Sequence, residues 1–174
     1  MSEAQIVQAL QRVFLASTLG IWVVIFLARV WILVFAPVLA WVWAYGKPKE
    51  KHAVKEALWS LGLALLAGEI LALFVLRVRP FLEVSNIITL IPPPLTSSFP
   101  SIHTAASMAM AAALYAGDKR LGQLGILIVI GVALGRVAAG VHYPSDILGG
   151  VLVGLASFAI VRLGHKALRK KTKD

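Results

Sequence analysis

The feature that most constrains the fold is a series of long apolar segments separated by short polar ones. Residues 13–45 are almost continuously apolar, and further apolar segments cover residues 57–76, 121–141 and 144–163. A helix needs about 20 apolar residues to cross a membrane. The composition agrees, because 59% of the residues are hydrophobic, only 14% are charged, and soluble domains are less apolar. The sequence therefore predicts an all-α, polytopic membrane helix bundle that forms a single domain, residues 1–174.

We expect about six helices in this bundle. Residues 3–12 suit an amphipathic helix, with Ile6, Val7 and Leu10 on one side. The segment 13–45 is too long for one untilted span and short for two. We therefore predict a short span or re-entrant helix to about residue 28 and a second span to residue 45. The alternative is five spans preceded by a short or interfacial N-terminal helix.

Most of the 17 Lys and Arg residues fall in three clusters, at residues 47–55, 119–120 and 162–173. Basic residues beside apolar segments are typical of the cytoplasmic side of a membrane protein and of contact with anionic lipid headgroups. They are not interleaved with aromatic residues as in a nucleic-acid-binding stripe, so we expect no nucleic-acid partner. Loops 77–100 and 135–146 alternate with these clusters, so both loops should lie on the opposite, extracytoplasmic face.

These two loops carry an unusual set of polar residues. The first contains Arg79 and leads into SSFPSIHTAAS at residues 97–107, and the second reads GRVAAGVHYPSD at residues 135–146. Ionisable groups near a membrane are costly and usually have a function. Because both loops are expected on one face, their polar residues should meet in a single site.

The basic residues of this set suit a phosphate group. Arg79 and Arg136 can each bind two oxygens of a dianion. A proline precedes the predicted helix 101–116, so the free N–H groups of Ser101, Ile102 and His103 would point at an anion. The sequence thus predicts a phosphate site made from two guanidinium groups and a helix N-terminus.

The remaining residues suit nucleophilic and acid catalysis. His142 lies four residues before Asp146, close enough for the carboxylate to orient the imidazole and leave its other nitrogen free as a nucleophile. A second histidine, His103, can protonate a leaving oxygen. We expect no metal or other cofactor, because the loops hold no carboxylate cluster for magnesium. A zinc site made from these three residues would leave the arginines unexplained.

Three motifs give the chain a family resemblance. Arg79-Pro80, PSIH at residues 100–103 and R-x5-H-x3-D at residues 136–146 resemble the three-part signature of the type 2 phosphatidic acid phosphatase (PAP2) superfamily. This superfamily includes undecaprenyl-diphosphate phosphatases, lipid A phosphatases, phosphatidylglycerophosphate phosphatases and glucose-6-phosphatase. RVRPFL followed by IPPPLTSSFPSIH is most similar to the bacterial polyprenyl-diphosphate branch. The resemblance implies a multi-pass protein of the bacterial cytoplasmic (inner) membrane, with an extracytoplasmic active site and a cytoplasmic C-terminus.

The resemblance also implies a role for each matching residue. His142 would attack phosphorus and form a phosphohistidine, with Asp146 orienting it and His103 protonating the leaving lipid oxygen. Water would then cleave the phosphohistidine. The phosphate oxygens would be held by Arg79, Ser101 and Arg136.

Three positions depart from the pattern of the superfamily. Ala72, Ile102 and Gly135 stand where a Lys, a Gly and a Ser are usual. We expect Arg77, two residues before Arg79, to replace the missing Lys and hold the outer phosphate of a diphosphate. The alternative is that Arg77 only reaches out to lipid headgroups.

The expected function is metal-independent hydrolysis of a lipid phosphate or diphosphate headgroup. Undecaprenyl diphosphate, lipid A 1-phosphate and phosphatidylglycerophosphate all remain candidate substrates. One alternative is a phosphotransferase that uses the same site to pass phosphate between lipids. Another is a non-catalytic lipid-binding or transport protein. A vanadium haloperoxidase would share the motifs, but such enzymes are typically soluble.

Overall fold

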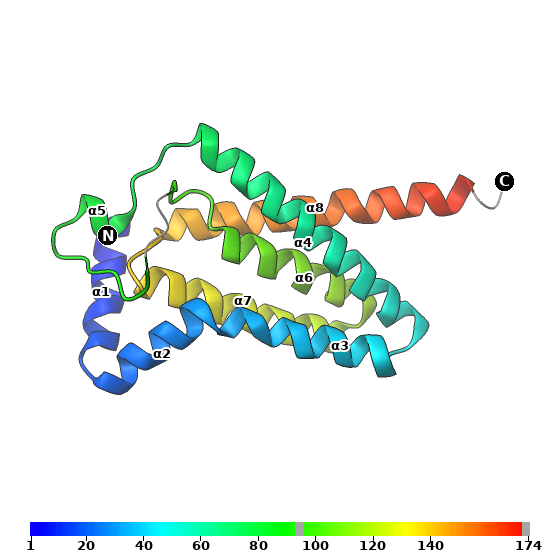
Figure 1. Ribbon diagram of the computed structural model, residues 1–174, viewed down its shortest axis with the longest axis horizontal. Helices are drawn as coiled ribbons and strands as arrows, with labels where there is room; N and C mark the ends of the chain where they lie inside the picture. The colour runs from blue at the N-terminus through cyan, green and yellow to red at the C-terminus, as the bar shows by residue number, and fades with distance from the viewer. Residues whose placement is uncertain (93–95, 172–174) are drawn as a thin grey trace.

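The computed structural model describes residues 1–92 and 96–171, with side chains as far as residue 168. The long helices lie side by side along the length of the molecule, and the loops that carry the three motifs gather at one end (Figure 1). Helix α6 is central and contacts α4, α7 and α8. In chain order the described helices are α1 (Glu3–Leu15), α2 (Thr18–Arg29), the 3-10 helix η1 (Trp31–Val34), α3 (Phe35–Tyr45), α4 (Pro48–Phe74), α5 (Pro80–Glu83), α6 (Ile102–Gly117), α7 (Lys119–Ala138) and α8 (Pro144–Lys171).

Among the described helices, α4, α7 and α8 are each long and apolar enough to cross a membrane. Helix α2 and the segment η1–α3 meet at a bend of 55° and would make a fourth span if they cross together. The expected all-α membrane bundle is therefore confirmed. For residues 13–45 we predicted a short span or re-entrant helix to about residue 28 and a second span to residue 45. In the structure α2 ends at Arg29, and the second helical segment of the bent pair ends at Tyr45. A separate N-terminal helix, α1, precedes the pair.

The basic segments are more helical than the sequence suggested. The basic cluster at residues 47–55, which separates two apolar segments of the sequence, mostly belongs to α4, which starts at Pro48. A side-chain oxygen of Glu50 accepts a hydrogen bond from the backbone N–H of Lys47 at 2.8 Å. Proline in the first turn and a carboxylate that caps the N-terminus both favour an early helix start. Helix α8 likewise continues through the basic C-terminal segment to Lys171, because Lys and Arg are good helix formers.

Small side chains fill much of the contact between α6 and its neighbours, and many large apolar side chains are exposed on the outside of the bundle. Ala105 and Ala109 of α6 are fully buried, whereas Leu73 of α4 and Leu152 of α8 are largely exposed. Small residues let membrane helices approach closely, and the outer apolar side chains suit contact with lipid. A Cβ atom added at Gly154 of α8 would lie 2.5 Å from the carbonyl oxygen of Ala105. The small-residue segment of α8 therefore packs closely against α6.

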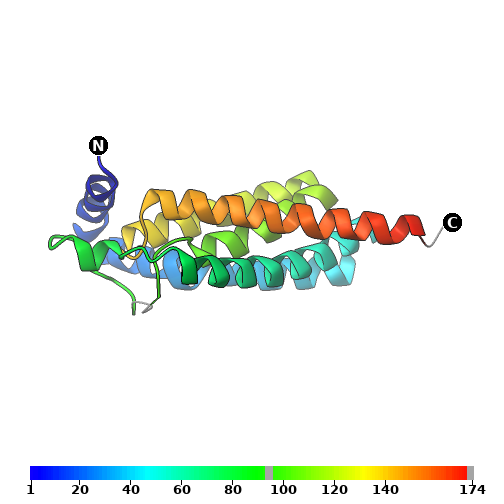
Figure 2. The same ribbon diagram turned by 90° about the horizontal axis from the view of Figure 1, so that it is seen from above.

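Helix α1 lies across the end of the bundle that holds the motif loops (Figures 1 and 2). Its buried Gln11 donates from Nε2 to the carbonyl oxygens of Ile88 and Ala138, at 2.7 and 3.1 Å. Glu3 accepts a hydrogen bond from the backbone N–H of Ser145 at 2.7 Å. The amphipathic N-terminal helix thus holds the loop after α5, the end of α7 and the start of α8 in place.

The contact between α6 and α8 predicts a difference between two glycines of the same helix. Gly154→Ala should destabilise the fold by about 1–3 kcal/mol, because the added methyl group collides with α6 backbone. Gly164→Ala is the matched control, since no atom lies within 4 Å of its added Cβ. Thermal unfolding of both variants in detergent measures the effect. Equal unfolding temperatures would contradict the close packing.

Candidate active site

A cavity of about 170 Å³ opens at the end of the bundle where the motif loops gather. It is formed by α4, the long loop before α6, the first turn of α6, the end of α7 and the loop before α8. Five of the residues predicted for the site, Arg79, Ile102, His103, Arg136 and His142, line it. The other lining residues are Glu69, Thr96, Ser97 and Pro100.

The two ring nitrogens of His142 have different partners. Nδ1 lies 2.7 Å from the carbonyl oxygen of Ser98, which can only accept a hydrogen bond, so Nδ1 carries a proton. Nε2 lies 3.2 Å from Nη2 of Arg136, which can only donate, so Nε2 presents its lone pair. The imidazole is therefore held as the neutral tautomer with the proton on Nδ1 and the lone pair on Nε2.

Burial also keeps His142 neutral. Its side chain is almost fully enclosed, and this burial, together with the positive charges of Arg136 and Arg79, lowers its pKa to about 4. The hydrogen bond to Asp146 acts in the opposite direction but does not overcome these effects. A histidine with this pKa is uncharged at neutral pH, as a nucleophile must be.

Asp146 supports His142 from a fixed position in the first turn of α8. Its Oδ2 lies 3.5 Å from Nδ1 of His142 and accepts a shorter hydrogen bond, 2.8 Å, from the backbone N–H of Tyr143. The fully buried carboxylate thus caps its own helix while it faces the imidazole. The Ser98 carbonyl is the nearer partner of Nδ1, and no sequence pattern could have indicated it because every residue has a carbonyl group.

Arg136 carries a nitrogen that lacks a partner. The residue is 4% exposed, and among the described residues its buried Nε atom has no hydrogen-bond acceptor. Leaving a buried donor unsatisfied is costly, and an anion in the cavity would satisfy it. The neighbouring Gly135 packs directly on α2, because a Cβ there would lie 2.6 Å from the backbone nitrogen of Ala28. The serine usual at this position in the superfamily would not fit.

Arg79 both lines the cavity and joins the two motif loops. Its Nε and Nη2 donate to the carbonyl oxygens of Thr96 and Ser97, at 2.9 and 2.8 Å. Its Nη1 donates to the carbonyl oxygen of Val141 in the other loop at 2.9 Å. A guanidinium has five N–H groups, so part of its capacity remains for an anion.

The N-terminus of α6 supplies further donors. Ile102 and His103 are the first two residues of this helix and both line the cavity. The first N–H groups of a helix have no partner within it and favour anions. Ser101 differs from its prediction, because it is fully buried, its N–H donates to the carbonyl oxygen of Asp146 at 3.0 Å, and it does not line the cavity.

Arg77, predicted to hold a second phosphate, lies outside the cavity lining. Its Nη1 donates to Oδ1 of Asp146 at 2.7 Å, and its Nη2 donates to Oε2 of Glu3 at 2.6 Å. The guanidinium also lies over the ring of Tyr143, 4.4 Å from its centre. The structure therefore pairs Arg77 with Asp146 and Glu3 and places it outside the cavity lining.

The environment of His142 predicts its titration. Because its pKa is lowered, the imidazole should stay neutral, with the proton on Nδ1, as the pH falls from 7 towards 4, and should become charged below that. NMR of protein labelled with ¹⁵N-histidine in detergent measures both properties, and a His142→Gln variant assigns the signal. A pKa near the ordinary value of about 6.5, or a proton on Nε2 at pH 7, would contradict the described geometry.

Both the sequence and the fold resemble those of known proteins. The sequence is 30% identical over 139 residues to the bacitracin transport permease protein BcrC of Bacillus licheniformis, covering 80% of this chain and 68% of that one. It is 28% identical over 136 residues to the undecaprenyl-diphosphatase BcrC of Bacillus subtilis, covering 76% and 68%. The crystal structure of Aquifex aeolicus LpxE superposes with a TM-score of 0.76 at 23% identity, over 90% of this chain and 92% of that one.

The last comparison is with protein families. The PAP2 superfamily matches residues 53–170, a segment that begins in α4 and contains every residue of the cavity lining. The resemblance inferred from the three motifs is thereby confirmed, and this membrane protein belongs to the PAP2 superfamily.

Proposed function

We propose that this protein hydrolyses a polyprenyl diphosphate through a phosphohistidine formed on Nε2 of His142. Membership of the PAP2 superfamily and the name of the Bacillus subtilis relative support the coarser statement, a membrane enzyme that hydrolyses lipid phosphates. The observation that carries the mechanism is the pairing of a neutral histidine with a buried, partly unsatisfied arginine. The Nε2 lone pair of His142 faces Nη2 of Arg136, and Nε of the same arginine has no acceptor among the described residues.

In the first step a terminal phosphate occupies the cavity against Arg136, Arg79 and the N-terminus of α6. Nε2 of His142 attacks phosphorus, and the bond from phosphorus to the leaving oxygen breaks. In the substrate-free protein, burial and neighbouring positive charges lower the pKa of His103 to about 4, so the negative charge of the bound diphosphate must raise it. The protonated His103 then donates its proton to the leaving oxygen, and a lipid monophosphate leaves. Positive charge that develops on the imidazole is stabilised through Nδ1 by the Ser98 carbonyl and the Asp146 carboxylate, as in other histidine–carboxylate pairs.

In the second step water replaces the histidine on phosphorus. His103, now neutral, takes a proton from the attacking water, and the bond between phosphorus and Nε2 breaks. Inorganic phosphate leaves, and His142 returns to its neutral form. His103 thus acts first as an acid and then as a base, which regenerates the site without another proton carrier.

The distribution of charge supports an extracytoplasmic active site in a bacterial cytoplasmic membrane. The basic start of α4 and the basic end of α8 lie at the end of the bundle away from the cavity (Figure 1). Basic ends favour the cytoplasm, so the cavity would face the other side, with the C-terminus in the cytoplasm. The name of the undecaprenyl-diphosphatase relative favours a polyprenyl diphosphate over lipid A 1-phosphate or phosphatidylglycerophosphate.

Phosphate release by the purified protein in detergent tests this function. We expect turnover of undecaprenyl diphosphate to exceed that of lipid A 1-phosphate and phosphatidylglycerophosphate, and to survive EDTA. His142→Ala should lower the rate by a factor of at least ~10⁴, since it removes the nucleophile. Gly164→Ala, in an open position of α8, serves as the active control.

Near-normal turnover by His142→Ala would contradict the mechanism. Phosphate that appears on a second lipid instead of in solution would identify a phosphotransferase. A folded wild-type protein that binds the lipids but releases no phosphate would favour the non-catalytic alternative.

The contacts of Arg77 make a separate prediction about substrate dependence. Because Arg77 holds Asp146 and does not line the cavity, Arg77→Ala should lower kcat/KM by about 10–100-fold, as expected for a lost charge-assisted hydrogen bond. The factor should be the same for a diphosphate and a monophosphate lipid. Glu3→Gln, which weakens the outer contact of the same guanidinium, should have a smaller effect. A clearly larger loss on the diphosphate would instead restore Arg77 as a phosphate ligand.

A further inference from the structure

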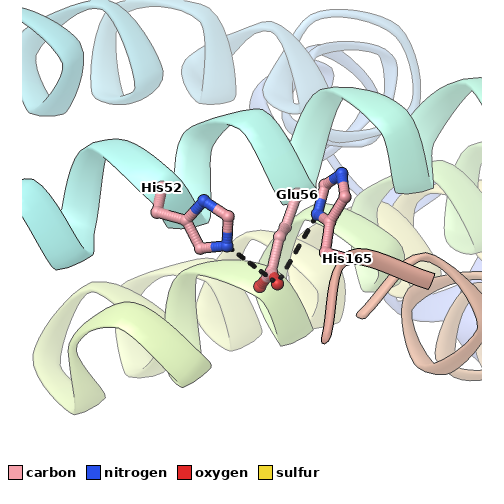
Figure 3. A group of neighbouring side chains, drawn as sticks. All are labelled: His52, Glu56 and His165. Atoms are coloured by element: carbon pink, nitrogen blue, oxygen red, sulfur yellow. Dashed lines mark ion pairs between the residues drawn. The ribbon is translucent and has the colours of Figure 1, made fainter. Parts of the chain in front are cut away.

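We propose that the protein has a second site, for a divalent metal ion such as zinc, at the end of the bundle away from the active site. The ligands are His52 and Glu56 of α4 and His165 of α8 (Figure 3). Their ligand atoms all lie within 4.8 Å of one another. The inference does not depend on the proposed phosphatase function, because the two sites share no residue.

The two imidazoles converge on one carboxylate oxygen of Glu56. Nε2 of His52 lies 3.5 Å from Oε1 of Glu56, and Nδ1 of His165 lies 3.8 Å from the same Oε1. Figure 3 shows both imidazoles pointing at this carboxylate from opposite sides. His52 and Glu56 are one helical turn apart on α4, so they share a face, and α8 brings the third ligand to that face.

Two features distinguish the cluster from an ordinary network of ion pairs. Glu56 is 4% exposed, and Arg162 approaches only its other oxygen, Oε2, at 3.4 Å. The Nδ1 atom of His165 is buried and has no hydrogen-bond partner in the described part of the chain. A metal ion between Oε1 and the two imidazoles would supply the missing interaction of His165.

The donor set suits zinc. Zinc binds histidine nitrogen and carboxylate oxygen at about 2.0–2.2 Å in tetrahedral geometry, which places neighbouring ligand atoms about 3.3 Å apart. The separations of 3.5 and 3.8 Å from Oε1 need only a small contraction, and the ligand nitrogens of the two imidazoles lie within 4.8 Å of each other. A cavity of about 190 Å³ adjoins the cluster and leaves room for water as the fourth ligand. Arg162, on the far oxygen, would hold the carboxylate in place as an outer-shell partner.

A bound ion would connect the start of α4 to the last turns of α8. We infer that it fixes this part of α8, which extends past the rest of the bundle in Figure 1. Metal ligands from two helices stabilise the folded state because the unfolded chain does not hold them together. The ion would stabilise the fold without taking part in hydrolysis at the other end.

Zinc binding by the full-length protein, purified without a polyhistidine tag and treated with EDTA, tests the proposal. Calorimetry with zinc alone should give one ion per chain, and zinc should raise the unfolding temperature by on the order of 5 °C. His52→Ala, Glu56→Gln and His165→Ala should each weaken binding at least tenfold, since even an outer-shell partner is worth about 10–100-fold. X-ray absorption of the wild-type complex should show two imidazoles and one carboxylate, a result that needs no variant to fold.

Two controls locate the ion. The double variant His103→Ala/His142→Ala removes the histidines of the active site and should still bind one zinc ion. Lys49→Ala removes a cation that lines the adjoining cavity and should bind zinc at least as tightly as the wild type.

Several results would overturn the proposal. These are a wild-type protein that binds no zinc, binding unchanged in His165→Ala, or an absorption spectrum with fewer than two imidazoles. If the wild type instead binds inorganic phosphate and Lys49→Ala loses that binding, the cavity is an anion site and the metal assignment is wrong.

Discussion

The candidate active site depends on the hydrogen bonds that the buried guanidinium of Arg79 donates. It donates to two carbonyl groups in the loop before α6 and to one in the loop before α8, and so fixes the distance between segments that are far apart in the sequence. The first loop carries the Ser98 carbonyl, and the second carries His142. Without this connection the carbonyl that selects the tautomer of His142 would have no fixed position. The guanidinium that we propose to bind phosphate therefore also positions His142 beside the Ser98 carbonyl.

Residues at increasing distance from His142 and the Ser98 carbonyl hold this pair in place. Arg77 holds Asp146 from outside the cavity, and Glu3 of α1 holds Arg77 in turn. Gln11 of the same helix fixes the end of α7, close to Arg136. Farther from the site, glycines of α8 press against α6 and set the position of the α6 N-terminus. In such an arrangement a change in α1 or α8 acts on catalysis through position, without touching the substrate.

Much of the site could be predicted from the sequence because its chemistry depends on residue type and order. Alternating apolar and basic segments were enough to predict that the two motif loops lie together, and the cavity contains Arg79, His103, Arg136 and His142. What could not be predicted involves backbone groups or distant partners. The Ser98 carbonyl carries no residue-specific signal. Arg77 pairs with Glu3, which is far from it in the sequence. At Gly135 there is no room for a side chain because α2 packs directly against it.

We propose that the phosphoryl group is transferred to His142 before water releases it. The stereochemistry of the reaction at phosphorus is the sharpest test of this covalent intermediate. The substrate is a polyprenyl diphosphate whose terminal phosphorus is made chiral with sulfur and oxygen isotopes, and hydrolysis takes place in isotopically labelled water. Transfer of the thiophosphoryl group first to His142 and then to water involves two inversions, so the released thiophosphate should retain its configuration. Net inversion would mean that water attacks the lipid phosphate directly, and would contradict the phosphohistidine.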